Sequence, residues 1–275
     1  MKILSLSSSV AHGHVGNSAL TLPLQRLGFE VTTVNTVQFS NHPGHGVFGG
    51  DVFAAEHVAR IIDGLDHAGF LTGHDGIVSG YLGDAANGAA LLRAVNANPG
   101  AVFLCDPVMG DQGRSYVRPG IAQVLAGPIL DAAQIVTPNL FELQSLSGLP
   151  VASLDQTITA ARSVLARGPR LVVVTSLEVA DGMACAGVTA DGAWLVTTPR
   201  LDFAQPLNGA GDLLAGLLLA ESLTHAGAPD LLAAAVSRLF AVLDITHRLG
   251  QRELALVAAQ DAVVSPPQWF GSQPY

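Results

Sequence analysis

The chain has 275 residues, of which 22 are acidic and 13 are basic, so its formal net charge is −9. Its one lysine, Lys2, excludes a P-loop and an interior Schiff-base lysine, and the acidic balance argues against a partner nucleic acid. No apolar run reaches the ~18 residues of a membrane-spanning helix, and the first residues resemble a strand more than a signal peptide.

Two hydrophobic spacings alternate along the chain. Runs typical of buried strands occupy residues 2–6, 31–34, 76–79, 101–105, 134–137 and 171–175, and a hairpin-like pair follows at 184–189 and 193–197. Helical spacing is found at residues 17–27, 52–65, 85–95, 121–130, 140–147, 154–166, 212–225 and 231–249. This alternation predicts an α/β fold in which helices cover both faces of a mostly parallel sheet.

The remaining segments indicate how the chain is organised. No linker, repeat or low-complexity tract interrupts the pattern, so we expect residues 1–275 to form a single domain. Residues 41–50 are rich in glycine and proline, which is typical of a loop that can move as a lid. Cys105 and Cys185 lie far apart in apolar segments, which predicts buried free thiols and a cytoplasmic location.

Polar groups follow most of the predicted strands, and ligands of open α/β sheets bind beyond the carboxyl ends of the strands. The most informative segment is Asn208-Gly209-Ala210-Gly211-Asp212, which leads directly into a predicted helix. Its small residues let backbone N–H groups converge on an anion, and a carboxylate beside them can take a proton from an attacking hydroxyl. Taken alone, the segment equally fits an ordinary helix cap after a glycine-rich turn.

Three more acids, Asp106, Asp111 and Glu142, lie in segments that follow predicted strands. Carboxylates together with ATP phosphates bind Mg²⁺, usually through one or two carboxylates and water. Each acid alone has a simpler interpretation, because Glu142 stands three residues after Asn139 and fits a capping box. Their combination with the Gly-Ala-Gly-Asp turn favours a phosphoryl-transfer site.

Two other site types are poorly supported. The nine histidines form no His-Glu-x-x-His motif and no Cys/His pair at zinc-ligand spacing. No Gly-x-Gly-x-x-Gly motif follows the first strand, which argues against a nicotinamide oxidoreductase.

Six ordered pieces of the sequence carry a family resemblance. They are His14-Val15-Gly16-Asn17, residues 35–42, Ser79-Gly80-Tyr81-Leu82-Gly83, Asp106-Pro107-Val108-Met109-Gly110, Pro138-Asn139-x-x-Glu142 and Gly209-Ala210-Gly211-Asp212. Together they resemble the pyridoxal kinases of the ribokinase-like superfamily over nearly the whole chain. The resemblance implies a three-layer αβα sandwich and ATP-dependent phosphorylation of the 5′-hydroxyl of pyridoxal, which gives pyridoxal 5′-phosphate.

The resemblance also implies roles for individual residues. Asp212 is expected to be the general base, with Gly209, Ala210 and Gly211 as the anion hole. The substrate would contact Ser8, Val15, His42, Pro43, Gly44, Tyr81 and Asp212. The ATP side would comprise Asp106, Asp111, Thr137, Glu142, Thr175, Ser176, Thr198, Pro199, Arg200 and Leu201.

The resemblance further implies Mg²⁺ at Asp106 and Glu142, a monovalent cation, and a homodimer. Some bacterial relatives have a lysine near Thr175, so here other groups must neutralise the phosphates, and Arg114 and Arg200 lie in loops from which they could do so. Two alternatives stay open. One is a hydroxymethylpyrimidine kinase, against which Tyr81 and residues 38–42 speak, and the other is a non-catalytic vitamer-binding protein, against which the intact Asp212 turn speaks.

Overall fold

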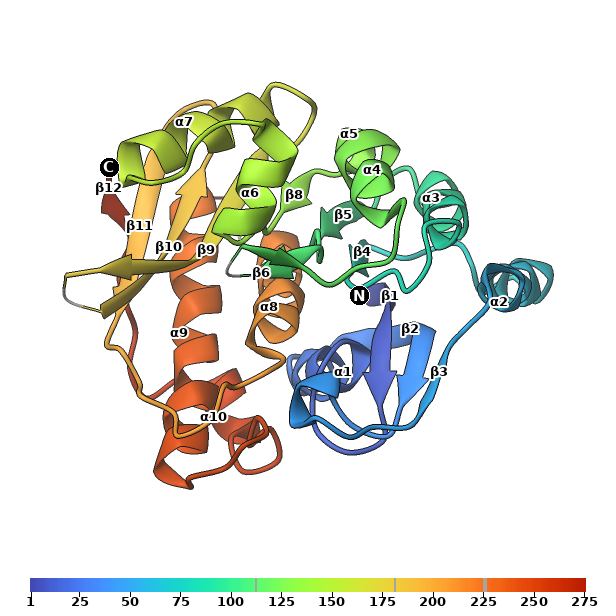
Figure 1. The fold of residues 1–275 in the computed structure, drawn as a ribbon, viewed down its shortest axis with the longest axis horizontal. Helices are drawn as coiled ribbons and strands as arrows, with labels where there is room; N and C mark the ends of the chain where they lie inside the picture. The colour runs from blue at the N-terminus through green and yellow to red at the C-terminus, as the bar shows by residue number, and fades with distance from the viewer. Residues whose placement is uncertain (112, 181, 225–226) are drawn as a thin grey trace.

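The computed structural model describes residues 1–111, 113–180, 182–224 and 227–275 (Figure 1). Ten strands within these residues form one sheet, which is parallel in its interior and antiparallel toward both edges. In spatial order the strands are β12 (Gln273–Pro274), β11 (Ala193–Thr198), β10 (Gly182–Val188), β9 (Leu171–Val179), β8 (Ile135–Val136), β5 (Val102–Cys105), β4 (Gly76–Ser79), β1 (Lys2–Val10), β2 (Glu30–Phe39) and β3 (Gly50–Val52).

The parallel strands are the ones predicted from apolar runs, but β1 and β2 are longer than predicted. β1 starts at the exposed Lys2 and continues through residues 7–9, which the sequence predicted as a loop. The prediction was wrong because the backbone of this segment stays paired with β2, where Ser7 lies opposite Asn35 and Ser9 lies opposite Gln38. Ser5 is fully buried in β1, and its Oγ donates to Asn17 Oδ1 at 2.6 Å.

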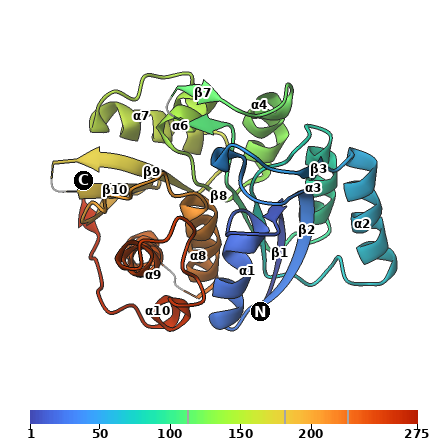
Figure 2. The same ribbon diagram turned by 60° about the horizontal axis from the view of Figure 1, so that its bottom comes forward.

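Helices cover both faces of the sheet, as predicted (Figure 2). Residues of β1 alternate between the two cores, with Leu4 and Leu6 in one and Ile3 in the other. Against the core of Leu4 and Leu6 pack α2 (Ala55–His67), α3 (Asn87–Asn96), α4 (Ile121–Val124), α5 (Leu130–Ala132), α6 (Leu140–Ser147) and α7 (Leu154–Leu165). Against the core of Ile3 pack α1 (Asn17–Arg26), α8 (Ala210–Thr224), α9 (Ala228–Arg248) and α10 (Gln260–Val264).

Some predicted elements differ from the structure. The helix predicted at 121–130 is interrupted by a π-helical segment, Leu125–Ile129, because Gly127 has non-helical torsion angles and Pro128 follows it. Several short elements were not predicted from the sequence: β3, the hairpin of β6 (Gly110–Asp111) and β7 (Arg114–Ser115), α10 and β12. The predicted helix end at residue 225 lies outside the described residues.

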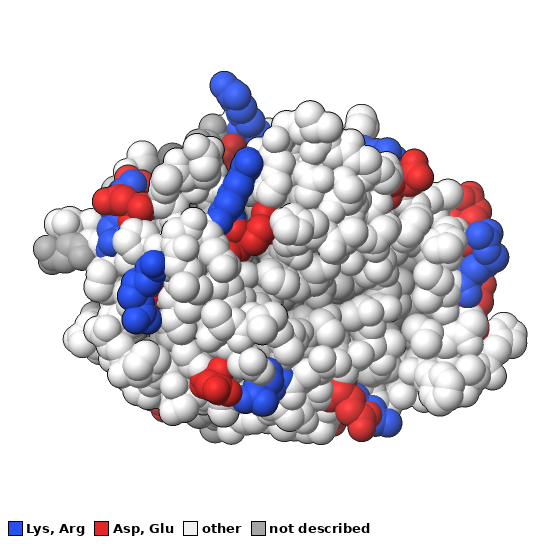
Figure 3. All heavy atoms as spheres, turned by 90° about the horizontal axis from the view of Figure 1, so that it is seen from below, with Lys and Arg blue, Asp and Glu red and all other residues white. Residues whose placement is uncertain are grey.

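Cys105 and Cys185 are buried and unbridged, as predicted. Within the described ranges, no helix combines the length and the hydrophobicity that crossing a bilayer requires. The face seen in Figure 3 carries its charged side chains in small groups that mostly mix both signs, and between them it is hollowed.

Candidate active site

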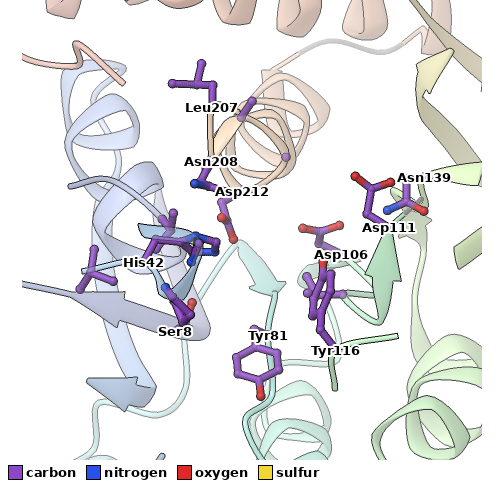
Figure 4. Close-up of a pocket in the computed structure, with 18 of the residues that line it drawn as sticks. Ser8, His42, Tyr81, Asp106, Asp111, Tyr116, Asn139, Leu207, Asn208 and Asp212 are labelled. Atoms are coloured by element: carbon purple, nitrogen blue, oxygen red, sulfur yellow. Dashed lines mark hydrogen bonds between the residues drawn. The ribbon is translucent and has the colours of Figure 1, made fainter. Parts of the chain in front are cut away.

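A cavity of about 630 Å³ opens where the parallel strands end (Figure 4). It brings together most of the residues predicted from the sequence, although they come from segments far apart in the chain. The predicted residues that line it are Ser8, Val15, His42, Pro43, Gly44, Tyr81, Asp106, Asp111, Thr137, Glu142, Thr175, Ser176, Gly209, Ala210, Gly211 and Asp212.

The turn before α8 has a backbone that only glycine fits. Gly209 has φ +86°, and a Cβ there would lie 1.9 Å from the carbonyl oxygen of His14. Ala210 and Gly211 form the first turn of α8, whose N–H groups have no partner within the helix. The end of a long helix therefore presents backbone donors and a positive dipole to the cavity.

Asp212 follows this turn and lies at the centre of the cavity wall in Figure 4. Burial raises the pKa of its carboxyl group to about 6, while a hydrogen bond from the Gly16 N–H acts in the opposite direction. The backbone of Gly80 approaches closely, because a Cβ there would lie 3.5 Å from Asp212 Oδ1. Asp212 is thus a fixed carboxylate, mostly ionised at neutral pH, beside an anion-binding turn.

A second group of acids lies on the side of β5 and α6. Glu142 Oε1 accepts from the Met109 N–H at 3.0 Å, and Oε2 accepts from the Asn139 N–H at 2.9 Å. Asn139 Oδ1 accepts from the Glu142 N–H, which completes the predicted capping box of α6. Glu142 therefore caps the helix and also lines the cavity.

The carboxyl groups of this side have raised pKa values. Burial raises the pKa of Glu142 to about 7, although the hydrogen bonds that it accepts from backbone N–H groups lower this pKa. Burial, followed by the negative charges of Glu142 and Asp212, raises the pKa of Asp106 well above its usual range, although Thr137 donates to it at 3.0 Å. Among the residues that the structure describes, no Lys or Arg lines the cavity.

This donor set fits a hard divalent cation. Carboxylate oxygens are the ligands that Mg²⁺ prefers, and an added cation would relieve the repulsion among the acids. The described part of the chain has no cluster of three His, Cys, Asp or Glu that could hold a metal alone. The two carboxylates, Asp106 and Glu142, would therefore need further ligands from nucleotide phosphates and water, and enzymes that use ATP generally require a divalent metal.

The opposite end of the cavity is apolar with a few polar groups. Val15, Tyr81, Pro43 and Gly44 line it, together with Ser8 from β1. Other parts of the wall were not assigned from the sequence, although Phe39, Val108, Asn139 and Asn208 lie within motifs that the sequence analysis singled out. The missed residues are Val10, Val37, Phe39, Val108, Tyr116, Asn139, Leu207 and Asn208.

His42 points into the cavity between Ser8 and Asp212 (Figure 4). Its Nδ1 accepts from the Gly44 N–H at 3.1 Å, so the neutral ring carries its proton on Nε2. Burial, and then the nearby His45, lowers the pKa of His42. His42 therefore remains neutral at physiological pH and can donate a hydrogen bond to a ligand.

On the nucleotide side, the structure supports only part of the prediction. Thr175 and Ser176 line the cavity, and Ser176 is the one non-glycine residue of the described chain with positive φ, at 59°. Thr198, Pro199, Arg200 and Leu201 do not line it. Arg200 instead lies near Glu178 at 3.2 Å and Asp202 at 3.4 Å, and Arg114 is exposed on β7, also outside the lining.

A smaller cavity, of about 250 Å³, begins immediately after Leu201. It lies between the segment that follows β11 and the end of α9. Its lining consists of Asp202, Phe203, Ala204, Gln205, His247, Gly250, Gln251 and Arg252.

Comparisons with known proteins agree with this geometry. Residues 30–252 match the family model described as phosphomethylpyrimidine kinase. The chain is 47% identical to pyridoxal kinase PdxY of Rubrobacter xylanophilus, over 98% of this chain and 96% of that protein. It is 45% identical to pyridoxal kinase PdxY of Deinococcus radiodurans, over 98% of this chain and 95% of that protein. The structure of Leishmania donovani pyridoxal kinase with ADP and pyridoxamine aligns with a TM-score of 0.89 and 29% identity, over 100% of this chain and 99% of that one. The chain belongs to the pyridoxal kinase family.

Proposed function

We propose that the protein transfers the γ-phosphoryl group of ATP to the 5′-hydroxyl of pyridoxal, giving pyridoxal 5′-phosphate and ADP. The observation that carries the proposal is Asp212, a carboxylate of raised pKa held beside the anion-binding turn of α8. Relatives of 39–47% identity are named pyridoxal kinase, and related structures contain ADP with pyridoxamine or pyridoxine.

The chemistry follows from the position of Asp212. Its carboxylate accepts the proton of the 5′-hydroxyl while the oxygen attacks the γ-phosphorus. The bond between the γ-phosphorus and the bridging oxygen breaks, and ADP leaves with the electron pair. The N–H groups of residues 209–211 stabilise the charge on the transferred group. A pKa of about 6 keeps Asp212 ionised and still basic enough to accept a proton.

The apolar end of the cavity suits the pyridine ring of the vitamer. Val15, Tyr81, Pro43 and Gly44 would form its walls, and Ser8 and His42 would offer hydrogen bonds to polar groups of the ring. We propose that residues 41–50 act as a lid over this end, within a single kinase domain of residues 1–275.

The acidic end of the cavity would receive the nucleotide phosphates. Mg²⁺ held by Asp106 and Glu142 would neutralise the phosphates when bound, and a monovalent cation would add to this. Asp111, Thr137, Thr175 and Ser176 would contact the nucleotide there. Residues 198–201 line neither this cavity nor the smaller one, so their contact with the nucleotide is proposed from the family resemblance alone.

Two further proposals concern the protein in the cell. Buried free thiols at Cys105 and Cys185 suit a reducing compartment, which supports a cytoplasmic location. The family resemblance supports a homodimer, which sedimentation would test.

The decisive experiment measures ATP consumption and product mass with pyridoxal, pyridoxine, pyridoxamine and hydroxymethylpyrimidine as acceptors. We expect turnover with pyridoxal, and loss of turnover but not of ATP binding in Asp212→Ala. Faster turnover with hydroxymethylpyrimidine would favour the alternative kinase, to which the name of the family model also points. Vitamer binding without turnover would indicate a non-catalytic protein.

A further inference from the structure

A segment just after α9 contacts both walls of the cavity without lining it. Arg252 Nη2 donates to the carbonyl oxygen of Gly44 in the lid, at 3.2 Å. The buried side chain of Leu254 packs against the turn before α8, 3.3 Å from the position that a Cβ at Gly209 would take. Glu253, between these two residues, reaches further segments of the site.

The two carboxylate oxygens of Glu253 serve different parts of the site. Oε2 accepts from the His14 N–H at 3.1 Å, in the loop before α1. Oε1 lies 2.8 Å from Nε2 of His45, at the end of the 3₁₀-helix (Pro43–His45) in the lid. Both side chains are largely buried, with 16% of Glu253 and 15% of His45 exposed, so the contact lies largely out of reach of solvent. One carboxylate thus joins the loop before α1 to the lid.

The loop before α1 in turn positions the catalytic groups. The His14 carbonyl oxygen lies so close to Gly209 that any side chain there would overlap it. Two residues further, the Gly16 N–H donates to Asp212. A shift of His14 would therefore move both the anion-binding turn and the donor that orients the base. Displacements of about 1 Å at such contacts can lower rates about 100-fold.

The lid contact is connected to the substrate end of the cavity. His45 closes the 3₁₀-helix that begins after His42, and His42 accepts from the Gly44 N–H. The charge of Glu253 raises the pKa of His42, whereas His45 lowers it, so both groups lie within electrostatic reach of the cavity wall. Release of His45 would free the segment that holds His42.

We propose that Glu253 is a positioning residue, which fixes the loop at His14 against the catalytic turn and holds the lid in place through His45. It touches neither substrate nor nucleotide, and it acts through Asp212 and His42. The inference rests on the proposed kinase function.

The experiment compares kcat and KM for pyridoxal, at saturating MgATP, in the full-length chain and its variants. His45→Ala removes the lid contact alone, so KM should rise about 10-fold while kcat stays within about 3-fold. Glu253→Ala removes both contacts, so kcat should also fall 10- to 100-fold. Glu253→Gln keeps an acceptor for the His14 N–H, so it should restore kcat to within about 3-fold but leave KM raised.

A matched control is Glu221→Gln on α8. Glu221 is a buried carboxylate that pairs with Arg238 away from the cavity. This change should lower the unfolding temperature and leave kcat and KM unaltered.

Three results would overturn the inference: kcat of Glu253→Ala within 2-fold of wild type, equal kcat losses in the Gln and Ala variants, or an equal kcat loss in His45→Ala. Far-ultraviolet circular dichroism checks folding. If Glu253→Ala does not fold, an unaltered KM in His45→Ala, or a kcat lowered 10-fold or more in Glu253→Gln, would overturn the inference instead. If the wild type does not phosphorylate pyridoxal, the proposed function fails, and the same comparison is made with hydroxymethylpyrimidine as acceptor.

Discussion

Replacing Asp212 by Asn should stabilise the folded protein while abolishing its activity. The pKa of this carboxyl group rises from 3.8 to about 6 on folding, mainly because of burial. At 1.36 kcal/mol per unit, the shift corresponds to about 3 kcal/mol against the folded state at neutral pH. Asn removes the buried charge and can still accept from the Gly16 N–H. The variant should therefore unfold roughly 5–10 °C higher than wild type, with kcat lowered by several orders of magnitude.

The pH dependence gives this prediction a sign that can be tested. Because the pKa of Asp212 is raised on folding, its destabilising contribution is present above about pH 6. It declines as pH falls through 6, and it vanishes below the unfolded value near 4. The stability difference between Asp212→Asn and wild type should therefore be largest near pH 8, about half as large at pH 5, and small only near pH 4.

Urea unfolding of both proteins at pH 8, 7, 6 and 5, followed by circular dichroism, measures this difference. Asp191→Asn, which removes a carboxylate from an exposed turn, is the control and should change stability by less than about 0.5 kcal/mol. A difference below about 1 kcal/mol at pH 8, or one that does not shrink on acidification, would refute the reasoning. In either case burial would not be what raises the pKa of Asp212.

Three further predictions concern the same site. Gly209→Ala should lower the unfolding free energy by about 2 kcal/mol or more and reduce kcat at least 100-fold. Gly211→Ala, whose Cβ meets no atom within 4 Å, should instead fold normally and lose affinity for ATP. Calorimetry measures the effect on stability, and initial rates measure the effect on catalysis. The pH profile of kcat/KM should have an acid limb near pH 6, below which activity falls tenfold per unit, and a flat profile down to pH 5 would contradict Asp212 as the base. Excess EDTA should reduce turnover at least 100-fold, and added Mg²⁺ should restore it, because four acids and no described Lys or Arg line the cavity. Full activity in EDTA would argue against a metal requirement.

The sequence predicted those parts of the fold whose signals are local. The run at 171–174 is apolar throughout because this part of β9 is buried on both faces, and the turn at Gly209 is visible because only glycine fits there. Acids after separate strands could be assigned to one site, because parallel strands end at the same edge. Asp106, Glu142 and Asp212 accordingly line one cavity.

The parts that were missed depend on contacts between distant segments. Nothing near Glu253 indicates that it meets His14 and His45, which lie more than 200 residues earlier in the chain. The segment at 198–201 was assigned to ATP from its place in the chain, but Arg200 lies toward Glu178 instead. The serines at residues 7–9 were assigned to a loop from their polarity, although their backbone continues β1 by pairing with the distant strand β2.

The position of Lys2 has a consequence for an enzyme that handles an aldehyde. Pyridoxal and its phosphate condense with amines to form imines, and Lys2 is the one side-chain amine in the sequence. It stands at the first residue of β1, whereas Ser8 lines the cavity six residues further along, about 20 Å away in an extended strand. Substrate and product therefore meet no lysine in the cavity, so they can leave without imine hydrolysis. An accumulating product has a single lysine to modify, at the opposite end of the strand.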